Sequence, residues 1–262
     1  MKKTVSKALT IGGSDSGGCA GIQADLKTFL ALKVHGMSVI TAITAQNTRG
    51  LTATQSVMTR IISAQLEAVL VDIGAGAVKT GMIPGPKAVR VITDCLREFR
   101  VRRYVLDPVM FTTSGERLIS DRSIRSLRCS LLPHALIITP NRGEAEVLAQ
   151  RPVNSLHQVR DAASVIHDLG VAYVLVKGGH FPGPAVDILY DGRDFLEFSS
   201  PKVQTRNLHG TGCTLSAAIT AYLAKGHELV DSVGKAKAYL DQALRSSFSV
   251  GKGPGPLGHL SW

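Results

Sequence analysis

The stretch ALTIGGSDSGGCAGIQADLKTFLALKVHGMSVITAIT, residues 8–44, contains the pattern that decides the fold. Its apolar run at 8–11 predicts a strand that ends at two glycines, and residues 21–33 carry apolar side chains near helical spacing. Residues 37–44 are rich in β-branched side chains and predict a second, buried strand. A strand, a glycine-rich loop, a helix and a strand in this order begin an α/β pattern.

The same alternation continues toward the C-terminal end. Further strands are expected at residues 77–79, 104–107, 136–139 and 173–177, and a hairpin at 186–198 with Asp191 and Gly192 at its turn. Helices are expected at about residues 60–72, 86–99, 121–131, 143–149, 156–169, 212–224 and 228–247. Repeated alternation predicts a mostly parallel sheet covered by helices on both faces. No linker divides the 262 residues, so we expect one domain over 1–262.

The composition excludes several classes of protein. With 44% hydrophobic and 19% charged residues, the chain can bury a large core and is not typical of disorder. The four cysteines, at positions 19, 95, 129 and 213, form no CxxC pair, which is typical of a reducing compartment. The apolar run near the N-terminus is too short for a signal peptide or a membrane span. We therefore expect a cytoplasmic protein that does not bind a membrane.

The net charge of +10 raises the question of a nucleic-acid partner. The basic residues are scattered, however, and aromatic residues make up only 5% of the chain. Because nothing interleaves basic and aromatic side chains, we expect a solvated basic surface and no nucleic-acid partner.

Polar or glycine-rich groups follow most of the predicted strands. They are GGSDSGGCAG (12–21), TAQN (44–47), KTGM (79–82), DPVM (107–110), TPN (139–141) and KGGH (177–180). Ligands of open α/β sheets bind beyond the carboxyl ends of the strands. The sequence therefore predicts a ligand site along one edge of the sheet.

The stretch HGTGCTLSAA, residues 209–218, predicts a loop that enters a helix. Backbone N–H groups at a helix N-terminus form an anion site, which glycines leave open and to which Thr211 can add a hydroxyl. The same environment is expected to lower the pKa of the Cys213 thiol. The alternative is a buried cysteine packed in a helix, which the spacing does not exclude. His209 is expected to be a loop residue with no catalytic role.

Four charged residues lie beside these loops, and each has two interpretations. Asn141 and Glu144 have the spacing of a helix capping box, but Glu144 can also face the site and hold Mg²⁺ directly or through water. Asp107 ends a buried strand, where a carboxylate is costly unless it turns the chain or lies near a cation. Lys177 either emerges into solvent or binds a triphosphate. Asp25 is favoured by the helix dipole or bonds a small polar ligand.

Several common nucleotide and nucleophile motifs are missing. Neither GxxxxGK[ST] nor GxSxG occurs in the chain. GPGPLG at 253–258 matches GxGxxG, but it lies in a tail that contains proline and has no helix after it.

Taken together, the motifs resemble a known family over essentially the whole chain. They are ALTIGGSDSGGCAGIQADLKTF, MSVITAITAQNT, DPVM, SGE, ITPN, EAE, VLVKGGH, HGTGCTLSAA and VGKGPGP. This ordered set resembles the hydroxymethylpyrimidine/phosphomethylpyrimidine kinases of thiamine biosynthesis. The resemblance implies a ribokinase-like, three-layer α/β/α fold, ATP with Mg²⁺, and a homodimer. It also implies two successive phosphorylations of 4-amino-5-hydroxymethyl-2-methylpyrimidine, to the monophosphate and then to the diphosphate.

The resemblance also assigns residues to roles. The pyrimidine would contact Gly13, Asp25, Gln46, Met82 and Val109, and the nucleotide would contact Asn141, Lys177, Thr211 and Gly212. The metal would be held at Asp107 and Glu144, and the catalytic group would be Gly210, Thr211, Gly212 and Cys213, whose backbone forms the anion hole. Cys213 stands where many ribokinase-like relatives carry an aspartate base. A thiol repels the phosphate nucleophile of the second step less than an aspartate does, and that nucleophile needs no base. We therefore expect Cys213→Ala to slow the first phosphorylation more than the second.

Three positions depart from the family pattern. Leu208 stands where the family often has Thr, and Cys19 stands where glycine is usual. Thr113 stands in place of a lysine, whose charge Arg117 could supply. These departures affect the expected rate and affinity rather than the class of activity.

Two rival functions remain open. Relatives with this cysteine pattern can accept vitamin B6 alcohols, so a pyridoxine/pyridoxal kinase is the nearer alternative. A catalytically silent nucleotide sensor is the other, although the presence of Cys213, Glu144 and Lys177 argues against it.

Overall fold

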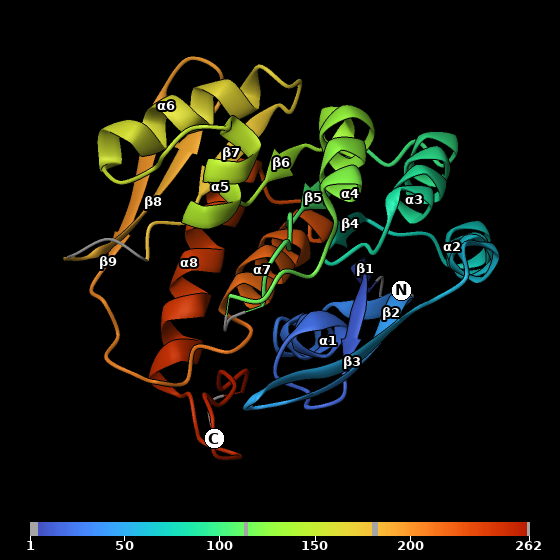
Figure 1. Ribbon diagram of the computed structural model, residues 1–262, viewed down its shortest axis with the longest axis horizontal. Coiled ribbons are helices and arrows are strands. Elements are labelled where there is room, and N and C mark those ends of the chain that lie inside the picture. Colours follow the sequence, from blue (N-terminus) through green and yellow to red (C-terminus); the bar gives the residue numbers. More distant parts are fainter. Residues whose placement is uncertain (1–4, 113–114, 180–182, 261–262) are drawn as a thin grey trace.

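The computed structural model describes residues 5–112, 115–179 and 183–260. The strands are β1 (Lys7–Asp15), β2 (His35–Asn47), β3 (Gly50–Ser56), β4 (Ala77–Thr80), β5 (Tyr104–Leu106), β6 (Ile137–Ile138), β7 (Tyr173–Val176), β8 (Ala185–Tyr190) and β9 (Phe195–Ser200). Within these ranges they form one sheet in the order β3-β2-β1-β4-β5-β6-β7-β8-β9 (Figure 1). The pairs from β2 to β7 are parallel, and β3, β8 and β9 pair antiparallel at the two edges. The predicted mostly parallel sheet is confirmed, as is the hairpin near its C-terminal edge.

The helices alternate with the parallel strands. They are α1 (Gly21–Ala31), α2 (Thr59–Asp72), α3 (Pro86–Glu98), α4 (Asp121–Ser126), α5 (Arg142–Ala149), α6 (Leu156–His167), α7 (Thr211–Ala224) and α8 (Leu229–Arg245). The single helix predicted at 121–131 is instead α4 followed by a π-helical turn at Leu127–Leu131 and a 3₁₀ turn at Leu132–His134. Pro133 lies in the second turn, and proline cannot continue an α-helix because it lacks the N–H.

Alternate residues of the central strands face opposite layers of helices. Leu9 and Ile11 of β1 belong to the apolar cluster that also contains residues of α2 to α6. Ala77 and Val105 belong to the cluster of α7 and α8, and α1 packs against α7 through the fully buried Phe29. Burying a side chain of that size contributes roughly 1.5–3 kcal/mol. The expected three-layer α/β/α architecture is therefore confirmed.

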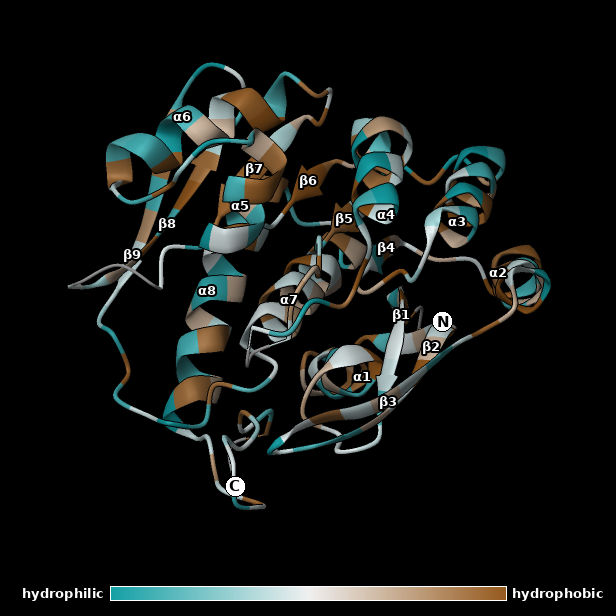
Figure 2. Cartoon of the chain, in the orientation of Figure 1, coloured by the Kyte–Doolittle hydropathy of each residue, from teal (hydrophilic) through white to brown (hydrophobic). Residues whose placement is uncertain are grey.

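The hydropathy pattern agrees with this layering. Figure 2 shows the central strand β6 in the brown of apolar residues, whereas the outer helices α3 and α6 are mixed teal and brown. A strand buried between two layers needs apolar residues on both faces, but an outer helix needs them only on the face toward the sheet. No helix in residues 5–112, 115–179 and 183–260 is long and apolar enough to cross a bilayer.

The β2–β3 hairpin is absent from the sequence prediction, which expected a loop after residue 44. β2 instead continues to Asn47, and β3 returns antiparallel to it, with a register shift between Ala45 and Gln46. Most residues of β3 are exposed, so the strand has no apolar face that would reveal it as a pattern. The hairpin is made by backbone pairing, and its consequence is that Gln46 projects from an ordered strand.

Candidate active site

A cavity of about 580 Å³ lies at the carboxyl ends of the parallel strands. Its lining comes from the segments that follow β1, β4, β5, β6 and β7, together with the N-terminus of α7 and the end of β2. The residues assigned to a site by sequence all line this one cavity: Gly13, Asp25, Gln46, Met82, Asp107, Val109, Asn141, Glu144, Lys177, Gly210, Thr211, Gly212 and Cys213. The expected edge of the sheet therefore carries a cavity, while the individual roles stay predictions.

The N-terminus of α7 opens onto this cavity. Gly210 caps the helix with a φ of 88°, and a Cβ at this position would lie 2.0 Å from the carbonyl oxygen of Cys19. Only glycine suits both the positive φ and the close approach. Lys177 lies directly beside this helix start, since a Cβ on Gly212 would be 3.2 Å from its Nζ. A cation and a free helix N-terminus thus meet at one point, which is an arrangement that attracts anions.

Thr211 and Cys213 differ from the sequence predictions in detail. The Thr211 hydroxyl donates to the Leu208 carbonyl at 2.6 Å, so in this state it closes the turn rather than facing an anion. Burial raises the pKa of the Cys213 thiol to about 12, although Lys79 and the backbone N–H of Gly21 act in the opposite direction. The predicted lowering is therefore wrong. Burial outweighs the helix start, and the thiol is neutral at pH 7.

Lys79 is a buried residue of the site that the sequence analysis missed. It is fully buried at the end of β4, and its Nζ lies 2.7 Å from Asp25 Oδ1 and 3.9 Å from Asp107 Oδ2. Thr10 Oγ1 donates to the other oxygen of Asp25 at 2.6 Å. Burial disfavours the charged form of Lys79, but the neighbouring groups, with Asp25 first among them, together more than offset this and raise the lysine pKa. Its place at the end of a buried strand resembles that of Lys177, but nothing in the sequence shows the carboxylates around it.

Asp107 is the acceptor for a second group of donors. Its Oδ1 accepts from Lys177 Nζ at 3.2 Å and from Thr139 at 3.4 Å, and its Oδ2 accepts from Ser216 of α7 at 3.0 Å. Burial alone would raise the pKa of Asp107, but Lys177 and Lys79 hold it below the usual range. Asp107 therefore stays ionised and joins α7 to the sheet.

Glu144 forms the predicted cap and also faces the cavity, while its metal role stays a prediction. The predicted capping box is confirmed: Asn141 Oδ1 accepts from the Glu144 N–H at 2.9 Å, and Glu144 Oε2 accepts from the Asn141 N–H at 2.7 Å. The same carboxylate lines the cavity and lies 3.9 Å from Lys177 Nζ. Burial raises the pKa of Glu144 to about 7, which Lys177 only partly counteracts. A buried carboxylate with so little compensation would be stabilised by an added cation.

Several other residues of the lining are uncharged. Met82 and Val109 line the cavity with apolar atoms, and a Cβ on Gly13 would lie 3.0 Å from Met82 Cε. Gln46 adds a carboxamide, whose Nε2 lies 3.0 Å from Nε2 of His209. His209 was expected to have no role, yet it is buried, and burial lowers its pKa although Asp15 acts in the opposite direction. Nothing local marks this contact, because 163 positions separate the two residues.

Comparison with known proteins gives this geometry a family. Residues 15–258 match the family model described as phosphomethylpyrimidine kinase. The chain is 49% identical to the hydroxymethylpyrimidine/phosphomethylpyrimidine kinase of Rhizobium meliloti (strain 1021), over 97% of this chain and 96% of that protein. The chain belongs to the phosphomethylpyrimidine kinase family.

Solved structures agree with the assignment. An ADP complex of Bacillus subtilis pyridoxal kinase superposes with a TM-score of 0.91 at 38% identity, covering 98% of both chains. A phosphomethylpyrimidine kinase from Clostridium difficile 630 superposes with a TM-score of 0.82 at 43% identity, covering 92% of this chain and 100% of that one. The resemblance to the family and its fold, inferred from sequence, is confirmed, and one neighbour was solved with an adenine nucleotide.

The departures from the family pattern have different surroundings. Leu208 lines the cavity with 45% of its surface exposed, and Cys19 is buried, with its backbone N–H bonded to Asp15. Thr113 lies outside the described residues. Arg117 is paired with Asp121 and donates to the Ile119 carbonyl, and its expected substitution for the lysine stays a prediction.

The residues present fit a magnesium-bound nucleotide better than a metal held by protein alone. No group of three or more His, Cys, Asp or Glu side chains suited to a metal occurs in the described part of the chain. Asp107 and Glu144 supply two carboxylates at the cavity wall. Mg²⁺ keeps several waters and commonly binds through one or two carboxylates together with substrate phosphates.

The far end of the cavity was not singled out by sequence. It is lined by β8, by residues 201–205 and by α8. Lys237 of α8 forms a buried ion pair with Asp187 of β8 at 2.8 Å, and Leu240 and Leu244 add apolar surface. This part of the lining therefore combines a buried ion pair with apolar side chains.

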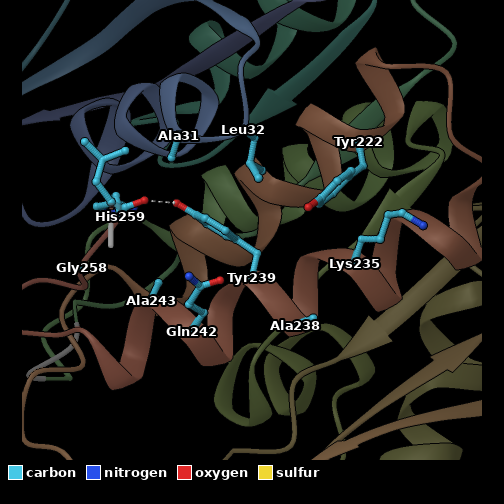
Figure 3. Close-up of a pocket in the computed structure, with 11 residues that line it drawn as sticks. Ala31, Leu32, Tyr222, Lys235, Ala238, Tyr239, Gln242, Ala243, Gly258 and His259 are labelled. Carbon is cyan, nitrogen blue, oxygen red and sulfur yellow. Dashed lines mark hydrogen bonds between the residues drawn. The ribbon is translucent and has the colours of Figure 1, made fainter. Parts of the chain in front are cut away.

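A second cavity, of about 440 Å³, lies between α1, α7, α8 and the C-terminal segment, and Figure 3 shows its lining. Tyr222 and Tyr239 face it, and the Tyr239 hydroxyl donates to the His259 carbonyl at 3.1 Å. We refer to it as the tail cavity.

Proposed function

We propose that this protein uses ATP to phosphorylate 4-amino-5-hydroxymethyl-2-methylpyrimidine to its monophosphate and then to its diphosphate, in thiamine biosynthesis. The observation that carries the proposal is that one cavity combines two kinds of lining. Lys177 and the open N-terminus of α7 form a positively polarised part of it, and the uncharged Gln46, Met82 and Val109 line it as well. The cavity volume of about 580 Å³ lies in the range of small-molecule sites.

Lys177 and the N-terminus of α7 suit the transferred phosphoryl group. Negative charge collects on its equatorial oxygens during transfer, and the catalyst mainly positions it and neutralises it. The backbone N–H groups of residues 210–213 would form the anion hole, while Lys177 would neutralise the phosphate oxygens. Thr211 would exchange its bond to Leu208 for one to the nucleotide, which Asn141 and Gly212 would flank.

The uncharged part of the lining suits the pyrimidine. Gln46 offers a donor and an acceptor side by side, and Met82 and Val109 can cover the two faces of a flat ring. Gly13 leaves space above Met82, and Asp25 would bond a polar edge of the ring. The end of the cavity at residues 201–205 remains for the adenine.

Mg²⁺ would be held at Asp107 and Glu144, where it would neutralise phosphate charge and orient the nucleotide. Both carboxylates already contact Lys177, at 3.2 and 3.9 Å. This chain therefore gathers negative side chains and a lysine around the place where a magnesium nucleotide would sit. Burial raises the pKa of the Glu144 carboxyl, and Asp107 adds to this, so a bound cation would stabilise the carboxylate, which supports the proposal.

Cys213 would face the nucleophile of both steps. Because its thiol is neutral, it would not repel the phosphate that attacks in the second step. In the first step the neutral thiol accepts no proton. It would hold the alcohol oxygen in line, and the alcohol proton, lost late along a loose transition state, would pass to an oxygen of the transferred phosphoryl group. We further propose that residues 1–262 act as one ribokinase-like domain, in a cytoplasmic homodimer.

A coupled assay of ADP release tests the function. The alcohol, its monophosphate and pyridoxal are supplied separately with ATP and Mg²⁺, and the products are weighed by mass spectrometry. We expect one and then two phosphates to be added to the pyrimidine. Pyridoxal kinase remains the second candidate, because a pyridoxal kinase superposes with a TM-score of 0.91. A much larger kcat/KM for pyridoxal would favour it, and no ADP release with any alcohol would favour a nucleotide sensor.

A further inference from the structure

The hydrogen bond between His209 and Gln46 joins two segments that the proposed reaction uses separately. Gln46 lies near the end of β2, and His209 directly precedes Gly210, the cap of α7. The two Nε2 atoms are 3.0 Å apart, and both side chains line the cavity. A primary amide nitrogen is only a donor, so the ring nitrogen of His209 accepts the bond and carries no proton.

This bond restricts the orientation of the Gln46 carboxamide. One N–H of the amide is directed to His209, and Gln46 Oε1 lies 3.3 Å from the Thr44 hydroxyl. The amide keeps a second N–H and further acceptor capacity on Oε1. These remaining groups form an adjacent donor and acceptor, which is the complement of an amino group beside a ring nitrogen.

The C-terminal segment holds both partners of the bond. The His209 N–H donates to the Gly255 carbonyl at 3.2 Å, and His209 pairs with Pro256 in an isolated bridge. The Gly253 N–H donates to Thr48 Oγ1 at 3.2 Å, in the turn just after β2. The GPGPLG stretch, which binds no nucleotide by its motif, thus ties the start of the α7 loop to the hairpin that carries Gln46.

We propose that His209 is a positioning residue that sets the specificity of this site for an aminopyrimidine. It holds the Gln46 carboxamide so that the free N–H meets the ring nitrogen and Oε1 meets the exocyclic amino group. Because His209 is covalently next to the anion hole, the same contact fixes the distance between the ring edge and the place of phosphoryl transfer. The inference rests on the proposed function.

The test compares KM and kcat for the alcohol in the unsubstituted protein, His209→Phe and His209→Gln. His209→Phe keeps a flat ring without an acceptor, and we expect it to raise KM about tenfold and to change kcat less than about twofold. His209→Gln keeps an acceptor at the ε position, and we expect it to restore most of the affinity. His259→Phe, in the tail cavity, is the matched control and should leave both constants unchanged.

Two further measurements separate positioning from a general structural role. The first uses 5-hydroxymethyl-2-methylpyrimidine, which lacks the amino group: the preference for the amino substrate should shrink about tenfold in His209→Phe. The second is a double-mutant cycle, in which His209→Phe should add little to Gln46→Leu.

The outcomes are distinguishable. If the unsubstituted protein is active and His209→Phe keeps its KM and its preference for the amino group, the inference is overturned and the proposed function is not. Full additivity with Gln46→Leu also overturns it. An unsubstituted protein that converts no pyrimidine alcohol overturns both this inference and the proposed function.

Discussion

Helix α7 borders both cavities, one at each end, and the two ends have opposite chemistry. Its N-terminus meets the strand-end cavity, whose lining includes the partly buried Lys177 and seven buried charged residues: Asp15, Asp25, Lys79, Asp107, Glu144, Asp187 and Lys237. Its C-terminal end contributes Tyr222 to the tail cavity, where the charged Lys235 pairs with Asp231 at the surface (Figure 3). The strand-end cavity is somewhat larger, about 580 against 440 Å³.

The difference shows which cavity costs the folded protein desolvation energy. Buried ions lose their hydration, and replacing them with apolar residues often leaves a protein as stable or more so. A set of buried charges facing a cavity is therefore weak support for stability and typical of a functional site. The tail cavity needs no such compensation, because aromatic rings and aliphatic side chains line most of it. Four predictions test this contrast, starting from the largest effect.

Removing the central cation should have the largest effect. Lys79→Met leaves the buried Asp25 without its partner at 2.7 Å, and we expect unfolding to become easier by about 3–5 kcal/mol. Urea denaturation at pH 7 measures this. Lys235→Met, which removes an exposed i,i+4 pair beside the tail cavity, is the control and should change stability by less than about 0.5 kcal/mol. Similar losses of unfolding free energy in Lys79→Met and Lys235→Met would mean that the buried ion pair contributes no more than the exposed one.

Shortening Cys213 should separate the two chemical steps. We expect Cys213→Ala to lower kcat/KM for the alcohol by about 10²-fold, because the thiol would hold the alcohol oxygen in line for attack. The loss for the monophosphate should stay below about tenfold, since its phosphate nucleophile is already ionised and is held by the anion site. Tyr222→Phe at the other end of α7 should change neither value. Equal losses for the two substrates of Cys213→Ala would contradict the assignment.

Glu144 should make the protein less stable as the pH rises. Its folded-state pKa of about 7 lies above the ordinary 4.5, so the folded protein holds a proton that the unfolded chain releases. The stabilisation is complete below pH 4.5 and is lost as the pH rises through 7. Without Mg²⁺, the melting temperature of Glu144→Gln relative to the unsubstituted protein should therefore increase from pH 5 to pH 8. A constant difference would place the carboxyl pKa near its ordinary value.

His259, in the tail cavity, should make the protein less stable as the pH falls. The effect should be smaller than that of Glu144, because His259 is partly exposed. Burial lowers its pKa from 6.5 to about 4, so the unfolded chain binds the proton first. The stabilisation is complete above pH 6.5 and is lost as the pH falls through about 4. His259→Asn keeps an atom near the Thr28 hydroxyl, which lies 3.3 Å from Nδ1. Its melting temperature should fall less between pH 7 and pH 5 than that of the unsubstituted protein; a parallel fall would argue against a neutral His259.

The sequence alone predicted most of the fold because the pattern is local. Strands buried on both faces are continuous apolar runs, and the outer helices have an apolar stripe, so both can be recognised from a few neighbouring residues. β3 was missed because its side chains are mostly exposed and its pairing is made by the backbone. The cavity residues were found by their place after each strand, together with the resemblance to the family.

Residues that act through distant partners could not be found in this way. His209 is defined by its bond to Gln46, 163 positions away, and Lys79 by its contacts with Asp25 and Asp107. Each looks ordinary in its own segment, one as a loop residue and the other as the end of a strand. Their importance comes from burial, which is a property of the packed molecule.

Cys213 shows where the two kinds of information separate. The sequence by itself determined that a cysteine stands in the first turn of a helix behind two glycines, with backbone N–H groups that favour an anion. Only the tertiary structure decided the charge of that cysteine, because the surrounding layers remove water from the thiol and raise its pKa to about 12. A helix start acts over one turn of the chain, whereas desolvation depends on every element packed around the atom.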